Sequence, residues 1–212
     1  MAGCHTIVIS SGLSSFFRSV QSILVGYVEL LRVVEIVVPN TCPEKYSLLL
    51  RLLHWGMAVI ILGLLVSGLI MSDLPKSYRY DVYGLHKSFG VIILGLVWLR
   101  LAARLVGTAP PMPSRWGRVQ NLLAQGTHAL LYLMMLIMPI SGYIMSNAKG
   151  YGVSLFGWSL PRVVQKHPPL GDIAAGVHHW VGYAFIVLLL LHVAAVIKHL
   201  WRDKENIRRR IW

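Results

Sequence analysis

Charged residues are scarce in this chain of 212 residues, and acidic residues are the scarcest. Only 13% of the residues are charged, whereas 56% are hydrophobic; an ordinary soluble domain has roughly 25% charged residues. So few charges cannot cover a surface that faces water, which argues against both a soluble domain and a disordered tail. Lys and Arg number 20 against eight Asp and Glu. A basic excess can indicate nucleic-acid binding, but the apolar content favours a membrane protein and no nucleic-acid partner.

Cysteine is nearly absent as well. Cys4 and Cys42 form neither a CxxC nor a CxxCH motif. This excludes covalently attached c-type haem, a zinc ribbon and a thioredoxin-like redox site. Nothing in the sequence supports a disulfide between the two residues.

Four apolar stretches are each long enough to cross a lipid bilayer, which requires about 20 mostly apolar residues. They cover residues 48–71, 84–106, 121–146 and 173–197. The linkers between them are polar or rich in proline, and no strand-like alternation competes with the apolar runs. We therefore predict an all-α, multi-pass membrane protein, with a four-helix transmembrane bundle in residues 45–212.

Residues 1–44 form an N-terminal extension to this domain. The segment 23–38 is apolar but carries Glu29, Arg32 and Glu35, which fall within an arc of roughly 120° on a helical wheel. This pattern predicts an amphipathic helix on the membrane surface. The extension lacks a basic start and a small-residue cleavage site, so it is not interpreted as a signal peptide.

The basic residues also predict the orientation of the bundle. Twelve of those near the span ends lie on the side of both chain termini, and six lie on the other side. The positive-inside rule therefore places both termini in the cytoplasm. The run Arg208–Arg210 is interpreted as part of this signal, or as an anchor to lipid headgroups.

The histidines within the spans fall at two depths. His86 lies near the outer side with His178 or His179, and the inner side holds His54, His128 and His192. His178 and His192 are 14 residues apart, so they lie within roughly 40° of each other on the wheel and about 21 Å apart along the axis. His179 lies on the opposite face of that helix.

Two pairs of histidines at two depths in a helical bundle are suited to two b haems, each held by two imidazoles. Ligation also removes the cost of burying an unpaired imidazole in a membrane. For any single histidine the alternative is a hydrogen bond between helices. Zinc or copper binding is a weaker alternative, because no cluster of Cys, Asp or Glu accompanies the histidines.

From residue 45 to the end, the chain resembles the bacterial cytochrome b561 family of four-span dihaem cytochromes. The similarity rests on motifs in the family order: KYSLLLRLLHW (45–55), LHKSFG (85–90), LRLAARL (99–105), PPMP (110–113), the long segment THALLYLMMLIMPISGYIMSNAKGYGVSLFGWSLP (127–161) and HVAAVIKHLWRD (192–203). The resemblance implies that His86 pairs with His178 for the outer haem, and that His54 pairs with His192 for the inner haem.

The resemblance also suggests auxiliary residues around the haems. His128 is a candidate to bond a haem propionate or a quinone, or to donate a proton, and the alternative is a contact between helices. Arg51, Arg100 and Arg104 are mainly explained by topology, but one of them is a candidate partner for propionates or quinone. Lys87 and Lys149 are candidates for the same role on the outer side, or for attracting an anion. Residues 150–161 are expected to cover the outer haem.

Three functions are compatible with the sequence. The first is electron transfer through two b haems to ubiquinone or a related quinone, in the respiratory chain; some relatives look like superoxide:quinone oxidoreductases that oxidise periplasmic superoxide. The second is a b-type cytochrome subunit that anchors a separate dehydrogenase or hydrogenase as its redox partner. The third is a membrane transporter or assembly factor without redox activity.

Overall fold

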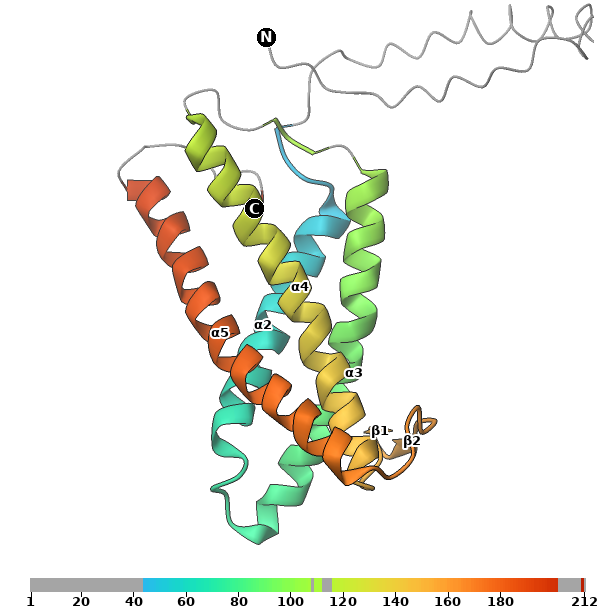
Figure 1. Cartoon of the computed structure of the whole chain (residues 1–212). Helices are drawn as coiled ribbons and strands as arrows, with labels where there is room; N and C mark the ends of the chain where they lie inside the picture. Colours follow the sequence, from blue (N-terminus) through green and yellow to red (C-terminus); the bar gives the residue numbers. More distant parts are fainter. Residues whose placement is uncertain (1–43, 108, 112–115, 202–210, 212) are drawn as a thin grey trace, which may run out of the picture. The chain divides into compact units, whose positions relative to one another are not determined.

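The computed structural model describes residues 44–107, 109–111, 116–201 and 211. Within these residues the chain forms four long helices: α2 (Leu48–Ile70), α3 (Lys76–Val106), α4 (Arg118–Ala148) and α5 (Pro168–Trp201) (Figure 1). All four are long and apolar enough to cross a membrane. The predicted all-α transmembrane bundle is confirmed. The predicted N-terminal amphipathic helix and both cysteines lie outside the described residues.

Three of the helices are longer than the apolar stretches that predicted them. Helix α3 begins at Lys76, directly after Pro75, so most of the expected linker 72–83 is helical. Helix α5 begins at Pro168, because the fixed φ and missing N–H of proline suit the first turn of a helix. Counting apolar residues finds only the part of a helix that lies in hydrocarbon, and the polar turns beyond it are not detected.

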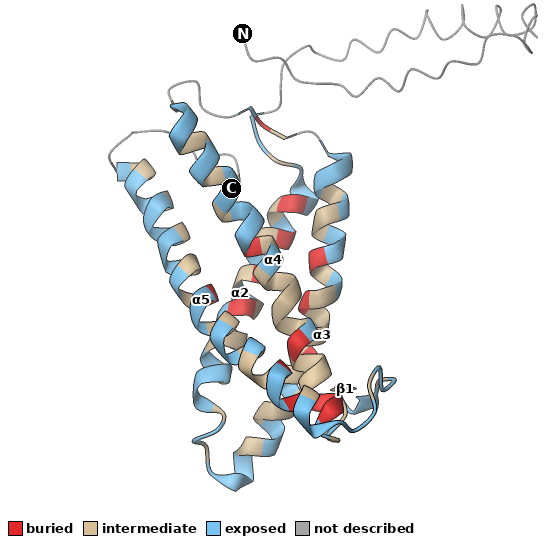
Figure 2. Cartoon of the chain, in the orientation of Figure 1, coloured by how far each residue is buried: buried red, intermediate tan, exposed pale blue. Residues whose placement is uncertain are grey.

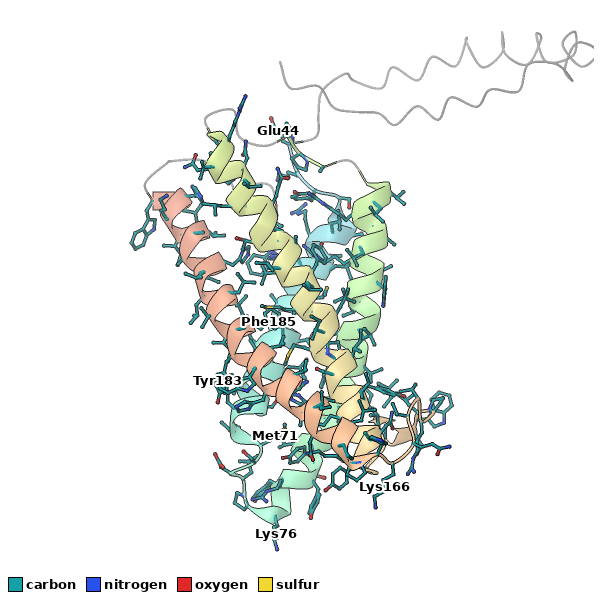
Figure 3. All side chains as sticks on the ribbon, in the orientation of Figure 1. Glu44, Met71, Lys76, Lys166, Tyr183 and Phe185 are labelled. Carbon is teal, nitrogen blue, oxygen red and sulfur yellow. The ribbon has the colours of Figure 1, made fainter. Side chains whose placement is uncertain are left out.

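The helices pack around a narrow apolar core. Helix α4 packs against both α3 and α5, and α2 packs against α3. The core draws on all four helices: Leu53, Met57, Ile61, Ile93, Val97, Leu131 and Phe185, of which Phe185 is labelled in Figure 3. Outside this core the helix surfaces are mostly exposed (Figure 2), and they carry large apolar side chains such as Val66 and Leu190. In a bilayer these side chains contact lipid rather than water.

A short β-hairpin lies in the linker between α4 and α5. Its strands, β1 (Ser154–Leu155) and β2 (Trp158–Ser159), pair antiparallel. They are joined by Phe156 and Gly157, whose φ angles are 49° and 92°. Two positive φ values in a two-residue loop match the twist of a tight hairpin. Sequence analysis missed the hairpin because two-residue strands are too short to show alternation.

The hairpin is attached to α3 through one buried side chain. The hydroxyl of Ser88 lies 2.9 Å from the Gly84 carbonyl and 3.1 Å from the Ser154 carbonyl, and it accepts a hydrogen bond of 2.9 Å from the Phe156 N–H. Ser88 is two residues after His86 in α3. The hairpin therefore lies beside the histidines that were predicted to be outer, and we call this end of the bundle the outer end.

Candidate functional site

The outer end brings together one histidine from α3 and one from α5. The ring centres of His86 and His178 are 6.3 Å apart, and the ring planes are inclined by 72°. Both side chains are half-buried. The structure thus brings together two of the histidines that the depth argument placed at one level.

Each of these two rings has a hydrogen-bond partner for its Nδ1 atom. His86 Nδ1 lies 2.9 Å from the hydroxyl of Ser67 in α2. His178 Nδ1 lies 2.9 Å from the Met138 carbonyl and 3.2 Å from the Ser141 hydroxyl, both in α4. Both rings are thus held through Nδ1, and none of these three contacts involves Nε2.

The neighbouring histidine on α5 has a different environment. His179 is exposed, and its ring makes edge contacts with Trp180 at 5.3 Å and with Tyr183 at 4.9 Å. Both contacts are made within its own helix. The structure therefore places His178, and not His179, beside His86, as the wheel argument expected.

The inner end contains three histidines rather than two. The rings of His128 and His192 are 5.6 Å apart with planes inclined by 78°. His128 Nδ1 lies 2.6 Å from the Ala124 carbonyl one turn earlier in α4. His54, the third histidine that the sequence places at this depth, has a buried Nδ1 with no hydrogen-bond partner among the described residues.

The arginines of the inner end differ in how they are bonded. Arg100 donates from Nε to the Tyr132 hydroxyl and from Nη1 to the Leu50 carbonyl, each at 3.0 Å. Arg104 lies 4.9 Å from the centre of the Tyr46 ring. The Nε of Arg51 is buried and has no partner within the described part of the chain. Arg100 therefore has a structural role between helices, whereas Arg51 retains a donor that no described residue of the chain satisfies.

Two lysines flank the outer pair. Lys87 donates to the Gly152 carbonyl at 3.2 Å and lies 5.8 Å from the centre of the Tyr151 ring. Lys149 forms an ion pair of 3.2 Å with Asp172. Lys87 thus ties the segment 150–161 to the turn of α3 that carries His86. Lys149 is already neutralised by a carboxylate.

Sequence reasoning missed the serines that contact the outer histidines. Ser67 and Ser141 were read only as part of apolar spans. Each is followed by glycine, and a Ser–Gly pair within an otherwise apolar helix is the signal that could have drawn attention to them. Among the residues that the structure describes, no three His, Cys, Asp or Glu side chains form a group suited to a metal ion.

Comparison with known proteins identifies the family. The model of the family described as prokaryotic cytochrome b561 matches residues 45–212. A relative named cytochrome b561 homolog 2, from Escherichia coli (strain K12), is 31% identical over 173 residues, covering 80% of this chain and 92% of the relative. The probable superoxide oxidase CybB of Yersinia pestis is 26% identical over 163 residues, covering 77% and 93%. Cytochrome b562 of Cereibacter sphaeroides is 27% identical over 172 residues, covering 78% and 94%.

The four apolar helices and the family match together define a membrane-embedded b-type cytochrome. Proteins of this class bind b-type haem and transfer electrons. They cross the bacterial inner membrane several times. The chain belongs to the prokaryotic cytochrome b561 family. Family membership supports electron transfer over the interpretation as a transporter or assembly factor.

Proposed function

We propose that the protein holds two b haems and transfers electrons from a donor at the outer face to a quinone. His86 and His178 hold the outer haem. Their separation of 6.3 Å is the observation that carries the proposal. Two imidazoles from facing helices at this separation would be the residues that hold the iron of one haem, each through Nε2, which the contacts above leave unused. Haem iron bound there supplies reversible one-electron transfer.

His54 and His192 hold the inner haem in this proposal. The buried, unpartnered atoms His54 Nδ1 and Arg51 Nε support it, because buried polar groups are normally hydrogen-bonded. A propionate would accept from Arg51 and satisfy one of them. His128 is then an auxiliary residue that positions His192 through its ring contact, while its Nδ1 is held by Ala124. Arg100 braces α2, α3 and α4 near the same site.

Haem stoichiometry of single variants tests the inner assignment. The variant His54→Ala is expected to lose half of the bound haem, and His128→Ala is expected to retain all of it. The measurement is the pyridine haemochrome content per protein after purification. If His128→Ala loses one haem while His54→Ala keeps both, the inner ligands have been assigned wrongly.

Superoxide is the donor that we propose. Two superoxide ions give one electron each and leave as two O2 molecules, and one quinone takes both electrons and two protons to become quinol. The relative from Yersinia pestis that is named a probable superoxide oxidase supports this choice. Lys87 at the outer end offers positive charge that attracts an anion.

Rapid mixing of the purified dihaem protein with superoxide, with and without a ubiquinone analogue, tests this activity. We expect reduction of the haem absorption bands followed by quinone-dependent reoxidation. A protein that superoxide does not reduce, or that fails to pass the electrons to quinone, would refute this function.

The proposed orientation has both termini in the cytoplasm. It rests on the uneven distribution of basic residues, since positive charge near span ends is retained on the cytoplasmic side. Reporter fusions at the C-terminus and in the linker 150–161 test it. A periplasmic signal from the C-terminal fusion would reverse the inner and outer ends.

A further inference from the structure

The two outer histidines are contacted by matching Ser–Gly pairs on the two other helices. Ser67–Gly68 in α2 lies against His86, and Ser141–Gly142 in α4 lies against His178. The serine of each pair contacts Nδ1 of the histidine. The glycine of each pair lies next to the same ring. Both histidines therefore lie against a Ser–Gly pair of a neighbouring helix, although they come from different helices.

The direction of the hydrogen bonds follows from the partners. The Ser67 hydroxyl donates to the Leu64 carbonyl at 3.1 Å, so its oxygen is left to accept from His86 Nδ1–H. The Ser141 hydroxyl likewise donates to the Met138 carbonyl at 3.0 Å. A carbonyl can only accept, so His178 Nδ1, 2.9 Å from the same carbonyl, must also carry a hydrogen. Both neutral rings then have their lone pair on Nε2, the atom that binds metal.

The glycines determine how closely each ring approaches the neighbouring helix. A Cβ atom at position 142 would lie 3.1 Å from Cε1 and 3.2 Å from Nδ1 of His178. These distances are tighter than almost all real Cβ contacts, so a side chain there requires the imidazole to give way by a few tenths of an ångström. A Cβ atom at position 68 would lie 3.4 Å from His86 Cε1, which is an ordinary contact. The close approach is therefore required at Gly142 and only permitted at Gly68.

The inner end lacks an equivalent arrangement. His54 Nδ1 is buried without a hydrogen-bond partner in the described part of the chain. The contact of His128 Nδ1 is to its own helix rather than to a serine of another. The Ser–Gly contacts are thus a specific feature of the outer pair.

We propose that Ser67 and Ser141, with Gly142, are positioning residues that set the tautomer, the orientation and the donor strength of the outer haem ligands. The inference rests on the proposed function, because it presumes that His86 and His178 hold a haem. A hydrogen bond from Nδ1–H increases the basicity of a ligating imidazole. A more basic ligand favours ferric over ferrous iron, so these contacts lower the reduction potential of the outer haem.

The structure predicts that the two serines differ in importance. Ser67 is the partner that the structure gives to His86 Nδ1, so Ser67→Ala leaves this nitrogen without it. His178 keeps the Met138 carbonyl when Ser141 is removed. We therefore expect the midpoint potential of the outer haem to rise clearly in Ser67→Ala and less in Ser141→Ala. Ser67→Thr retains the hydroxyl and should stay near the wild-type value.

Redox titration of the purified holoprotein, followed by visible absorption, measures these shifts. Ser146→Ala is the matched control, because the hydroxyl of Ser146 in α4 contacts the Gly152 carbonyl rather than a histidine. The electron paramagnetic resonance spectrum of the ferric protein reports the angle between the two imidazole planes. It should change in Gly142→Ala and remain unchanged in Gly126→Ala, where an added Cβ meets nothing within 4 Å.

The outcomes separate this inference from the proposed function. If His86→Ala removes one haem but the potential of Ser67→Ala equals that of wild type, the positioning role is refuted and the haem site stands. An equal shift in Ser146→Ala, or a larger shift in Ser141→Ala than in Ser67→Ala, also refutes it. If His86→Ala keeps both haems, both proposals fail. If Ser67→Ala does not fold, Gly142→Ala and Gly126→Ala test the inference instead. A change in the electron paramagnetic resonance spectrum of Gly142→Ala alone would support it, and equal spectra for the two variants would refute it.

Discussion

Replacing His178 or His179 separately distinguishes a haem ligand from a membrane-facing neighbour. The two residues are adjacent in sequence, so their environments differ because their side chains lie on different faces of α5. His178 lies 6.3 Å from His86 and contacts α4 through Nδ1. His179 is exposed and touches only side chains of its own helix among the ring contacts that the structure describes.

The size of the two effects follows from these contacts. If His178 is one of the two outer-haem ligands, as proposed, His178→Ala should abolish binding of that haem and halve the haem content. His179→Ala removes two edge contacts between aromatic rings, each worth about 0.5–1.5 kcal/mol. It should therefore lower stability by no more than about 1–3 kcal/mol in total and leave the haem content unchanged.

The assay is the haem-to-protein ratio after purification, together with the reduced-minus-oxidised spectrum. His178→Ala should keep the signal of the inner haem, which distinguishes loss of a ligand from loss of the fold. Retention of both haems in His178→Ala together with loss of one in His179→Ala would refute the assignment of the inward face of α5.

Three further predictions concern residues outside the ligand pairs. Ser88→Ala leaves the Phe156 N–H without its partner, at a cost of about 1–3 kcal/mol, so limited proteolysis should cut the hairpin faster than in wild type; equal cutting rates would contradict this. Arg100→Met loses two hydrogen bonds of 3.0 Å and should lower the thermal unfolding temperature. Arg100→Lys should restore only part of this loss, because an ammonium lacks the planar fork of a guanidinium. Full restoration by lysine would contradict this reasoning. Lys149→Met breaks an exposed ion pair with Asp172 and should change stability by less than about 1 kcal/mol; a large drop in the same thermal assay would show that this pair has a greater role.

Much of the bundle was accessible from sequence because membrane spans are local features. The length and apolarity of each span are properties of consecutive residues, and a span in lipid must form a helix to satisfy its own backbone. The phase of His178 and His179 followed from helical periodicity for the same reason. The helix ends were less accurate, since α3 and α5 continue into polar turns beyond the membrane.

The candidate site was only partly accessible. The depth argument grouped His86 with His178 or His179 at one end, and His54, His128 and His192 at the other, because depth depends on position along a span. Depth alone could not tell which of the three inner histidines would bind haem. The pairing of His54 with His192 is still a prediction. The contact between His128 and His192 depends on how α4 and α5 are rotated toward each other.

The amino-acid sequence by itself determined that this chain is a membrane bundle with imidazoles at two depths, because hydrophobic length and helical phase are encoded in neighbouring residues. Only the tertiary structure decided which atoms meet across helices. The bonds of Ser67 to His86, of Met138 and Ser141 to His178, and of Ser88 to the hairpin join residues between 19 and 68 positions apart. Such contacts depend on the rotation and spacing of packed helices, which no local pattern in the sequence specifies.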